Sequence, residues 1–209
     1  MVSKRVLYVL LFSFALLVFG CATTQPKIPV DLASAQPGNQ VMFQGKPVKL
    51  LGSPISIGKP LPSVDLVDAM TMSNVDLSKE KGSVLLLSIV PSLDTPVCDA
   101  QTHYLGDKGN DLPPGVKRIV ISRDTPFAQK RFAREAKLTN LRYLSDYKQG
   151  DFARGTGLLI DGMMLLARSV IVVDRTGTVR YVQVVPEMTH LPNMDEAFEK
   201  AAELVKSGS

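Results

Sequence analysis

From residue 41 onward, apolar positions alternate between strand-like runs and helix-like spacing. The run GSVLLLSIV, bounded by Gly82 and Pro91, is typical of a central strand buried on both faces. The segment VKRIVISRD predicts a second strand of this kind. Shorter strands are predicted in SVDLVDA, SNVDLS and LRYLSD, and hairpins are predicted around Gly45 and Gly177.

Helical spacing appears between these strands and again at the C-terminal end. In residues 125–138, Thr125 can cap a helix whose first position is Pro126. The apolar residues expected near one face of this helix are Phe127, Phe132 and Leu138. GDFARGTG predicts a helical turn, and residues 193–207 predict an amphipathic helix with acidic residues early and a lysine late. This order of elements predicts an α/β fold in which helices flank both faces of a mixed sheet.

The first twenty residues have the pattern of a secretion signal. Lys4 and Arg5 precede the apolar residues 6–20, a stretch shorter than the roughly 20 residues that a spanning helix needs. The string LLVFGC resembles the lipobox of bacterial lipoproteins, in which the cysteine, here Cys21, becomes the lipid-carrying N-terminus. Several acyl chains on one cysteine are enough for stable anchoring. The alternative is an ordinary signal peptide or an uncleaved anchor, with Cys21 incidental.

The chain therefore divides into a signal peptide (1–20), a lipidated cysteine with a flexible polar tether (21–40) and one folded domain (41–209). Removal of the signal leaves 22 of the 24 basic residues against 20 acidic ones. This small net charge, without a basic cluster interleaved with aromatic residues, argues against nucleic acid as a partner. The expected localisation is the bacterial cell envelope, with an exported domain held at a membrane on the periplasmic or outer-surface side.

The stretch PSLDTPVC places a cysteine directly after the buried strand. If the strand ends near Val90, Thr95 is the N-cap, Pro96 is the first helical residue and Cys98 lies in the first turn. Unpaired backbone N–H groups and the positive end of the helix dipole favour a thiolate there. The alternative is that Cys98 is only a small buried residue.

The spacing of this stretch limits the redox chemistry. A C-x-x-C motif would indicate a dithiol oxidoreductase, but Thr95 stands where the first cysteine would be. No disulfide can close within the motif. A single nucleophilic sulfur with a hydroxyl donor one turn away suits attack on an O–O bond.

Pro91, Thr95 and Cys98 match the P-x-x-x-T-x-x-C signature of peroxiredoxins. Together with FQGKPV, PSLDTPVCDAQT, DTPFAQKRFA and LARSVIVVD, they resemble the bacterial thiol peroxidase branch over about residues 41–206. The resemblance implies a thioredoxin-like fold with an N-terminal β-hairpin. It also implies an enzyme that reduces hydrogen peroxide and organic hydroperoxides without a metal or organic cofactor.

The resemblance also implies roles for four residues. Cys98 is the peroxidatic thiolate, which attacks the terminal peroxide oxygen and becomes a sulfenic acid. Thr95 places its hydroxyl against the thiolate and the peroxide, and Pro91 shields the pocket from water. Arg168 stabilises the thiolate and holds the peroxide oxygens. Without the resemblance, Arg168 reads as a surface charge at a strand edge.

One position departs from the family pattern. Where members of this branch carry a resolving cysteine, this chain has Ala133. A lipidated Cys21 is a thioether and cannot form a disulfide. We therefore expect a one-cysteine cycle, in which an external thiol, either a thioredoxin-like protein or a small thiol, reduces the Cys98 sulfenate. If Cys21 is not lipidated, it is an alternative, distant resolving thiol.

Other candidate residues carry weaker signals. His103 lies five positions after Cys98, which does not bring the two side chains onto one helix face, so a surface position is expected. His190 lies in a loop that borders the pocket or has no role. Two histidines and two cysteines, scattered, do not form a metal site. Met163 and Met164 are expected in core or interface packing. Members of this branch commonly form homodimers, which the sequence leaves open here.

Two hypotheses from different classes follow. The first is a membrane-tethered peroxidase whose anchor holds it where lipid or alkyl hydroperoxides form. The second is a non-catalytic envelope lipoprotein that uses the same fold as a binding module, prompted by the missing resolving cysteine. The presence of Pro91, Thr95, Cys98 and Arg168 together favours the enzyme.

Overall fold

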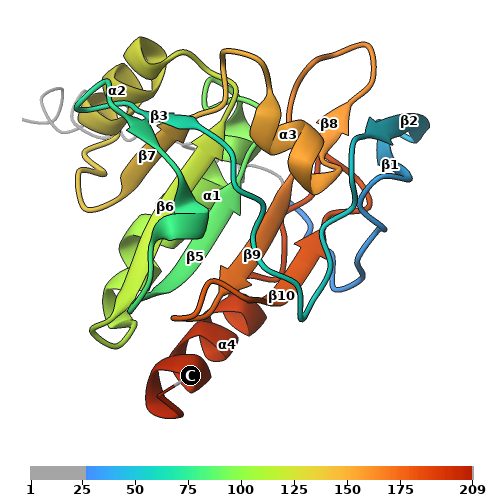
Figure 1. Cartoon of the computed structure of the whole chain (residues 1–209). Coiled ribbons are helices and arrows are strands. Elements are labelled where there is room, and N and C mark those ends of the chain that lie inside the picture. Colours follow the sequence, from blue (N-terminus) through green and yellow to red (C-terminus); the bar gives the residue numbers. More distant parts are fainter. Residues whose placement is uncertain (1–26, 209) are drawn as a thin grey trace, which may run out of the picture.

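The computed structural model describes residues 27–208, which contain a seven-stranded sheet of order β10-β9-β5-β6-β7-β3-β4 (Figure 1). β5, β6 and β7 are parallel, whereas β9 and β3 run antiparallel to their neighbours β5 and β7. The strands are β3 (Leu66–Asp68), β4 (Asn74–Val75), β5 (Val84–Ile89), β6 (Val116–Ser122), β7 (Arg142–Ser145), β9 (Ser169–Val173) and β10 (Val179–Val184). The predicted mixed sheet is confirmed.

A smaller antiparallel sheet has the order β1-β2-β8. Its strands are β1 (Gln40–Phe43), β2 (Lys46–Leu51) and β8 (Leu159–Ile160). The two-residue turn between β1 and β2 has positive φ at both Gln44 and Gly45, which matches the twist of an antiparallel hairpin. The N-terminal hairpin expected around Gly45 is therefore present.

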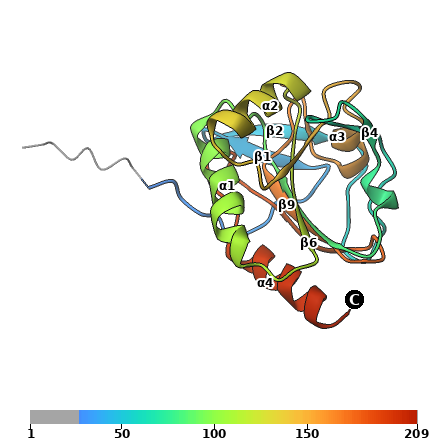
Figure 2. The same cartoon turned by 90° about the vertical axis from the view of Figure 1, so that its left-hand side faces the viewer.

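Helices cover both faces of the large sheet. They are α1 (Pro96–Asp107), α2 (Pro126–Glu135), α3 (Asp151–Thr156) and α4 (Met194–Lys206), with 3-10 turns η1 (Leu77–Lys79) and η2 (Lys108–Asp111). Figure 2 shows α1 and α3 on opposite sides of the sheet. Side chains alternate along each strand, so Leu86, Val170 and Val172 pack with α1, α2 and α4, while Leu85, Leu87 and Ile171 pack on the α3 side. Both faces of the central strands are consequently buried, as the apolar run of β5 predicts.

Phe127 of α2, which was expected to pack near the same face as Phe132, is exposed to solvent instead. Thr125 caps this helix by accepting a hydrogen bond from the Ala128 N–H, and Pro126 opens it, as predicted. However, Phe127 is 71% exposed, whereas Phe132 is buried. Five positions correspond to a rotation of about 140° around a helix, so these two rings cannot share a face. The prediction for Phe127 was therefore wrong.

Part of the expected tether lies against the domain. Residues 1–26 are outside the described part of the chain, but residues 29–35 form hydrogen bonds with the body of the protein. The Ala35 N–H donates to the Val184 carbonyl at 2.8 Å, along the outer edge of β10. The tether expected over 21–40 is thus not free over its second half, because its backbone satisfies an otherwise open sheet edge. Within residues 27–208 no helix is long and apolar enough to cross a membrane.

The turn between β9 and β10 is built around the buried carboxylate of Asp174. Burial opposes its ionisation, but hydrogen bonds from Thr176, Thr178 and Arg180 outweigh burial and lower the pKa of Asp174 to about 2. A folded-state pKa below the unfolded value near 4 means that the ionised form stabilises the fold above about pH 4, and that this stability is lost as the pH falls toward 2.

We expect Asp174→Asn to lower the free energy of unfolding by about 2 kcal/mol at neutral pH, with the difference from the unmodified protein vanishing near pH 2. Urea denaturation at a series of pH values measures this. Asp161→Asn, at an exposed position, is the control and should change neither stability nor its pH dependence. A constant difference between Asp174→Asn and the unmodified protein at all pH values would contradict the assignment.

Candidate active site

Cys98 lies in the first turn of α1 and is fully buried. Pro96 opens the helix, and Thr95 occupies the N-cap position with an extended backbone, as the sequence predicts. The sulfur therefore lies at the positive end of the helix dipole. Cys98 has no exposed surface in this structure.

The inner face of α1 brings polar groups into the core beside this cysteine. Cys98, Gln101, Thr102 and Leu105 are all buried and follow the spacing of a single helix face. The Gln101 amide donates from Nε2 to Ser88 Oγ of β5 at 2.8 Å. Gln101 thus has its side chain fixed between α1 and the sheet.

Arg168 precedes β9 and shares the sheet face of Val170 and Val172, which points toward α1. Arg168 is 3% exposed, and its guanidinium has three acceptors, two on α1 and one in the loop after β10. Nη2 donates to Cys98 Sγ at 3.3 Å, Nη1 to Gln101 Oε1 at 2.8 Å, and Nε to the Met188 carbonyl at 3.0 Å. The arginine is therefore held in one orientation, with one nitrogen directed at the sulfur.

The charge balance of this cluster leaves a buried cation beside the sulfur. Within residues 27–208 no carboxylate pairs with Arg168, although an unpaired buried cation is energetically costly. A Cys98 thiolate 3.3 Å away would supply the missing negative charge. The contact also directs a charged N–H donor at the sulfur. The arrangement can therefore activate a nucleophilic sulfur without a metal.

Thr95 and Pro91 lie close to Cys98 in the sequence, but the structure shows no hydrogen bond from the Thr95 hydroxyl to the sulfur. Pro91 is buried at the end of β5, which fits the expected shielding role. The Thr95 hydroxyl donates to the Ser92 carbonyl at 3.0 Å and so closes a local turn. The expected contact between this hydroxyl and the thiolate is therefore absent in this structure, whereas Arg168 is brought to Cys98 as predicted.

Comparison with known proteins identifies the family and the fold. A family model described as Redoxin matches residues 56–198. The chain is 39% identical to a thiol peroxidase of Halalkalibacterium halodurans over 161 residues, 77% of this chain and 96% of that protein. It is 36% identical to a thiol peroxidase of Bacillus subtilis over 167 residues, 80% and 99% of the two chains. A peroxiredoxin-like protein from Aquifex aeolicus has a crystal structure that matches with a TM-score of 0.75 and 35% identity, covering 82% of this chain and 99% of that chain.

The chain belongs to the redoxin family, in the thiol peroxidase branch of the peroxiredoxins. The resemblance drawn from the motifs is confirmed, as are the thioredoxin-like fold and the expectation that this redoxin is a peroxidase enzyme.

Ala133 of this redoxin, the position of the missing resolving cysteine, is buried on the inner face of α2. It packs in the same cluster as Cys98, below a surface groove that is also lined by Phe127 and Met70. Cys98 is the one cysteine within the described residues, and Cys21 lies outside them. No second sulfur in residues 27–208 can form a disulfide with Cys98.

Sequence reasoning missed several residues that position the site. Gln101 had a usable signal, because it lies three positions after Cys98 on the same helix face. Ser88 had a weaker one, as a polar residue within an apolar strand. Asp124, after β6, accepts hydrogen bonds from the Ser92 hydroxyl at 2.7 Å and the Leu93 N–H at 2.8 Å, and so holds the loop before α1.

The remaining candidates lie away from the sulfur. His103 is on the outer face of α1, 3.6 Å from both Asp99 and Asp107, which confirms the surface position. Met163 and Met164 are 38% and 45% exposed, so core packing was the wrong expectation for them. Among the residues that the structure describes, no three His, Cys, Asp or Glu side chains are grouped to hold a metal ion.

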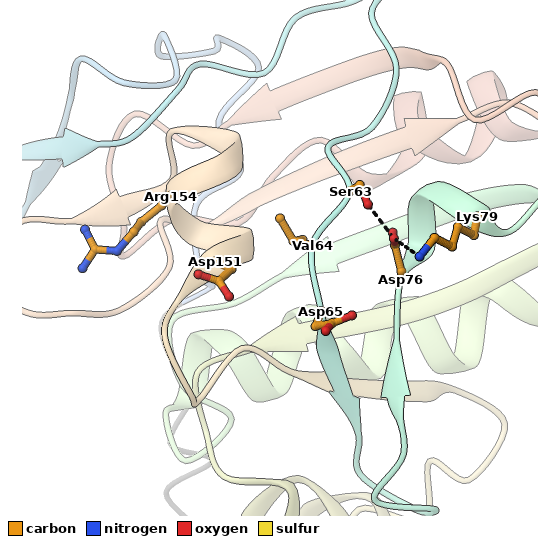
Figure 3. Close-up of a pocket in the computed structure, with 7 residues that line it drawn as sticks. All are labelled: Ser63, Val64, Asp65, Asp76, Lys79, Asp151 and Arg154. Carbon is orange, nitrogen blue, oxygen red and sulfur yellow. Dashed lines mark hydrogen bonds and ion pairs between the residues drawn. The ribbon is translucent and has the colours of Figure 1, made fainter.

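An open groove of about 500 Å³ lies on the other side of the sheet from α1 (Figure 3). It is lined by Ser63, Val64, Asp65, Asp76, Lys79, Asp151 and Arg154. Burial opposes ionisation of Asp76, but hydrogen bonds from Ser63, Ser78 and Lys79 lower its pKa to about 2. The charge of this carboxylate is already matched by protein groups, and the groove is not part of the Cys98 site.

Proposed function

We propose that this redoxin is an exported, membrane-anchored peroxidase that reduces hydroperoxides at Cys98 in a one-cysteine cycle. The observation that carries the proposal is the contact between Arg168 Nη2 and Cys98 Sγ at 3.3 Å, in a cluster without a carboxylate. The two relatives named above are thiol peroxidases, which supports a hydroperoxide as substrate and a thiol as reductant.

The first step is attack of the Cys98 thiolate on the terminal oxygen of the peroxide. An S–O bond forms, the O–O bond breaks, and the leaving alkoxide or hydroxide takes a proton to give an alcohol or water. Arg168 keeps its donors near the sulfur while negative charge moves from sulfur to the leaving oxygen. The product at the protein is a Cys98 sulfenic acid.

The second step uses an external thiol. This thiol attacks the sulfenic sulfur, releases water and leaves a mixed disulfide, which a second thiol reduces to regenerate Cys98. Ala133 at the resolving position supports this route, because no cysteine of residues 27–208 can compete with the incoming thiol. The reductant is either a thioredoxin-like protein or a small thiol.

Export and anchoring rest on the pattern of residues 1–21, with a lipid-carrying Cys21 as the first residue of the mature chain. Five residues separate Cys21 from Lys27, and the six Cα–Cα steps between them can span at most about 22 Å. Residues 29–31 are bound to Leu191, at the end of the loop of residues 186–191 that holds Arg168. A short connection between lipid and active site favours alkyl and lipid hydroperoxides at the membrane surface as substrates.

A single-turnover experiment on the full chain tests the cycle. After one equivalent of cumene hydroperoxide, we expect stoichiometric peroxide loss and dimedone labelling of Cys98, with no disulfide until a thiol is added. Mass spectrometry of the same sample reads acyl chains on the N-terminal cysteine peptide.

Cys21→Ser is the matched variant and should leave peroxide loss and labelling of Cys98 unchanged. A disulfide between Cys21 and Cys98 in the unmodified chain would contradict the one-cysteine cycle and show that Cys21 acts as a resolving cysteine. Peroxide loss no faster than that caused by a free thiol would contradict the peroxidase function and favour the alternative of a non-catalytic binding module.

A further inference from the structure

The loop of residues 186–191 orients Arg168 and is itself hydrogen-bonded to two other segments of the chain. Its Met188 carbonyl accepts the hydrogen bond from Arg168 Nε at 3.0 Å. On one side, Met42 of β1 bonds the loop twice, with its N–H to the Pro186 carbonyl at 2.6 Å and its carbonyl to the Met188 N–H at 2.9 Å. On the other side lies the N-terminal arm, which we define as residues 29–35.

The N-terminal arm pairs with the end of this loop through its backbone. The Asp31 N–H donates to the Leu191 carbonyl at 2.9 Å, and the Leu191 N–H donates to the Pro29 carbonyl at 2.8 Å. Further along, the buried Gln183 donates from Nε2 to the carbonyls of Asp31 and Ala33 at 2.8 and 3.0 Å. The arm is thereby fixed between β10 and the loop.

The Asp31 side chain reaches both flanks of Met188. Its Oδ1 lies 3.1 Å from His190 Nδ1, and its Oδ2 accepts the Glu187 N–H at 3.3 Å. One carboxylate therefore ties the residue before Met188 to a residue two positions after it. The carbonyl that orients Arg168 lies between these two attachments.

We propose that Asp31 is a positioning residue for the reaction at Cys98, acting through Met188 and Arg168. The proposal rests on the proposed peroxidase function. A carbonyl displaced by a fraction of an ångström turns the guanidinium that it holds, and such a displacement weakens the Nη2 contact with the sulfur. The N-terminal arm precedes residues 56–198, the part of the chain that the redoxin model matches.

The arm thus carries Asp31, whose carboxylate holds one residue on each side of the carbonyl that orients Arg168. In the sequence, the arm follows Cys21. Deleting the charge at position 31 should loosen the loop without opening the core, because the Asp31 side chain is only partly buried, with 23% of it exposed. The rate of reaction with hydroperoxide and the fraction of Cys98 present as thiolate should then fall together.

The test uses the full chain carrying Asp31→Asn, and Asp31→Ala as a second variant. We expect the second-order rate constant with cumene hydroperoxide to fall about tenfold. We also expect the pH profile of Cys98 alkylation by iodoacetamide to move toward higher pH, because Arg168 is less well directed at the sulfur. Asp31→Glu should recover part of both losses.

Ser34→Ala is the matched control in the same arm. It removes the hydrogen bond from the Val184 N–H to the Ser34 hydroxyl, 3.0 Å long, without touching residues 186–191. We expect it to lower the thermal midpoint slightly and to change neither rate nor alkylation profile.

An unchanged alkylation profile in both Asp31 variants would overturn the proposal, whatever their thermal stability. The profile does not depend on peroxidase activity. If the unmodified protein does not reduce peroxide, the proposed function fails, while the alkylation profile still decides whether Asp31 positions Arg168.

Discussion

Replacing Cys98 with serine will abolish catalytic peroxide reduction, with the second-order rate constant lower by at least about a thousandfold. A serine hydroxyl stays protonated at neutral pH and attacks an O–O bond poorly, whereas a thiolate beside Arg168 is a strong nucleophile. The replacement is nearly isosteric, and the hydrogen bond from the Thr102 hydroxyl to the carbonyl of residue 98 is retained. We expect the thermal midpoint to stay close to that of the unmodified protein, measured beside the rate of hydroperoxide loss.

Peroxide consumed by exposed methionines must be distinguished from peroxide consumed at Cys98, because peroxides slowly oxidise methionine to its sulfoxide. Met70, Met72, Met163 and Met164 are between 38% and 46% exposed. The Cys98→Ser variant should therefore lose peroxide slowly, gaining oxygen only on methionine peptides. A rate within tenfold of the unmodified protein would show that Cys98 is not the reacting group.

The sheet could be predicted from sequence because its signals are local. The apolar run of β5, the glycine turns at 45 and 177, and the Thr-Pro starts of two helices each depend on a few neighbouring residues. Cys98 was found in the same way, from the cap and proline before it. The error at Phe127 came from comparing positions five apart, which do not share a helix face.

The environment of Cys98 could be predicted only in part, because it is built from distant segments. Arg168 follows Cys98 by 70 positions and was found only through the family resemblance. The Met188 carbonyl has no side-chain signal in the sequence. The folded part of the expected tether escaped notice because a polar, proline-containing segment shows no periodicity, although its backbone can still pair with a sheet edge.

Arg168→Met is expected to lower the rate constant about a hundredfold to a thousandfold, the range seen when one donor to a developing charge is removed. Methionine has a similar length and is tolerated in a buried site, but it offers neither charge nor donors. The fraction of Cys98 present as thiolate at neutral pH should fall, because the sulfur would lose its cationic neighbour. The pH profile of alkylation measures this fraction, and hydroperoxide loss measures the rate.

A stability loss accompanies this variant and has to be distinguished from a catalytic one. Without the guanidinium, Gln101 Oε1 and the Met188 carbonyl lose their donors, at a cost of about 1–3 kcal/mol each. Arg118→Met is the matched control: Arg118 also donates to three acceptors, the carbonyls of Leu105 and Gly106 and the Asn110 side chain, at the far end of α1. It should lose stability and keep its rate.

Arg168→Lys separates charge from geometry at the same position. A lysine keeps the cation but cannot span the sulfur, the Gln101 amide and the Met188 carbonyl with one planar group. We expect its alkylation profile to stay near that of the unmodified protein while its peroxidase rate falls, because the thiolate is kept and the directed donors are lost. If lysine and methionine lowered the rate equally and left the thiolate fraction unchanged, Arg168 would serve the fold rather than the sulfur, and activation of Cys98 would have to come from the N-terminal end of α1 alone.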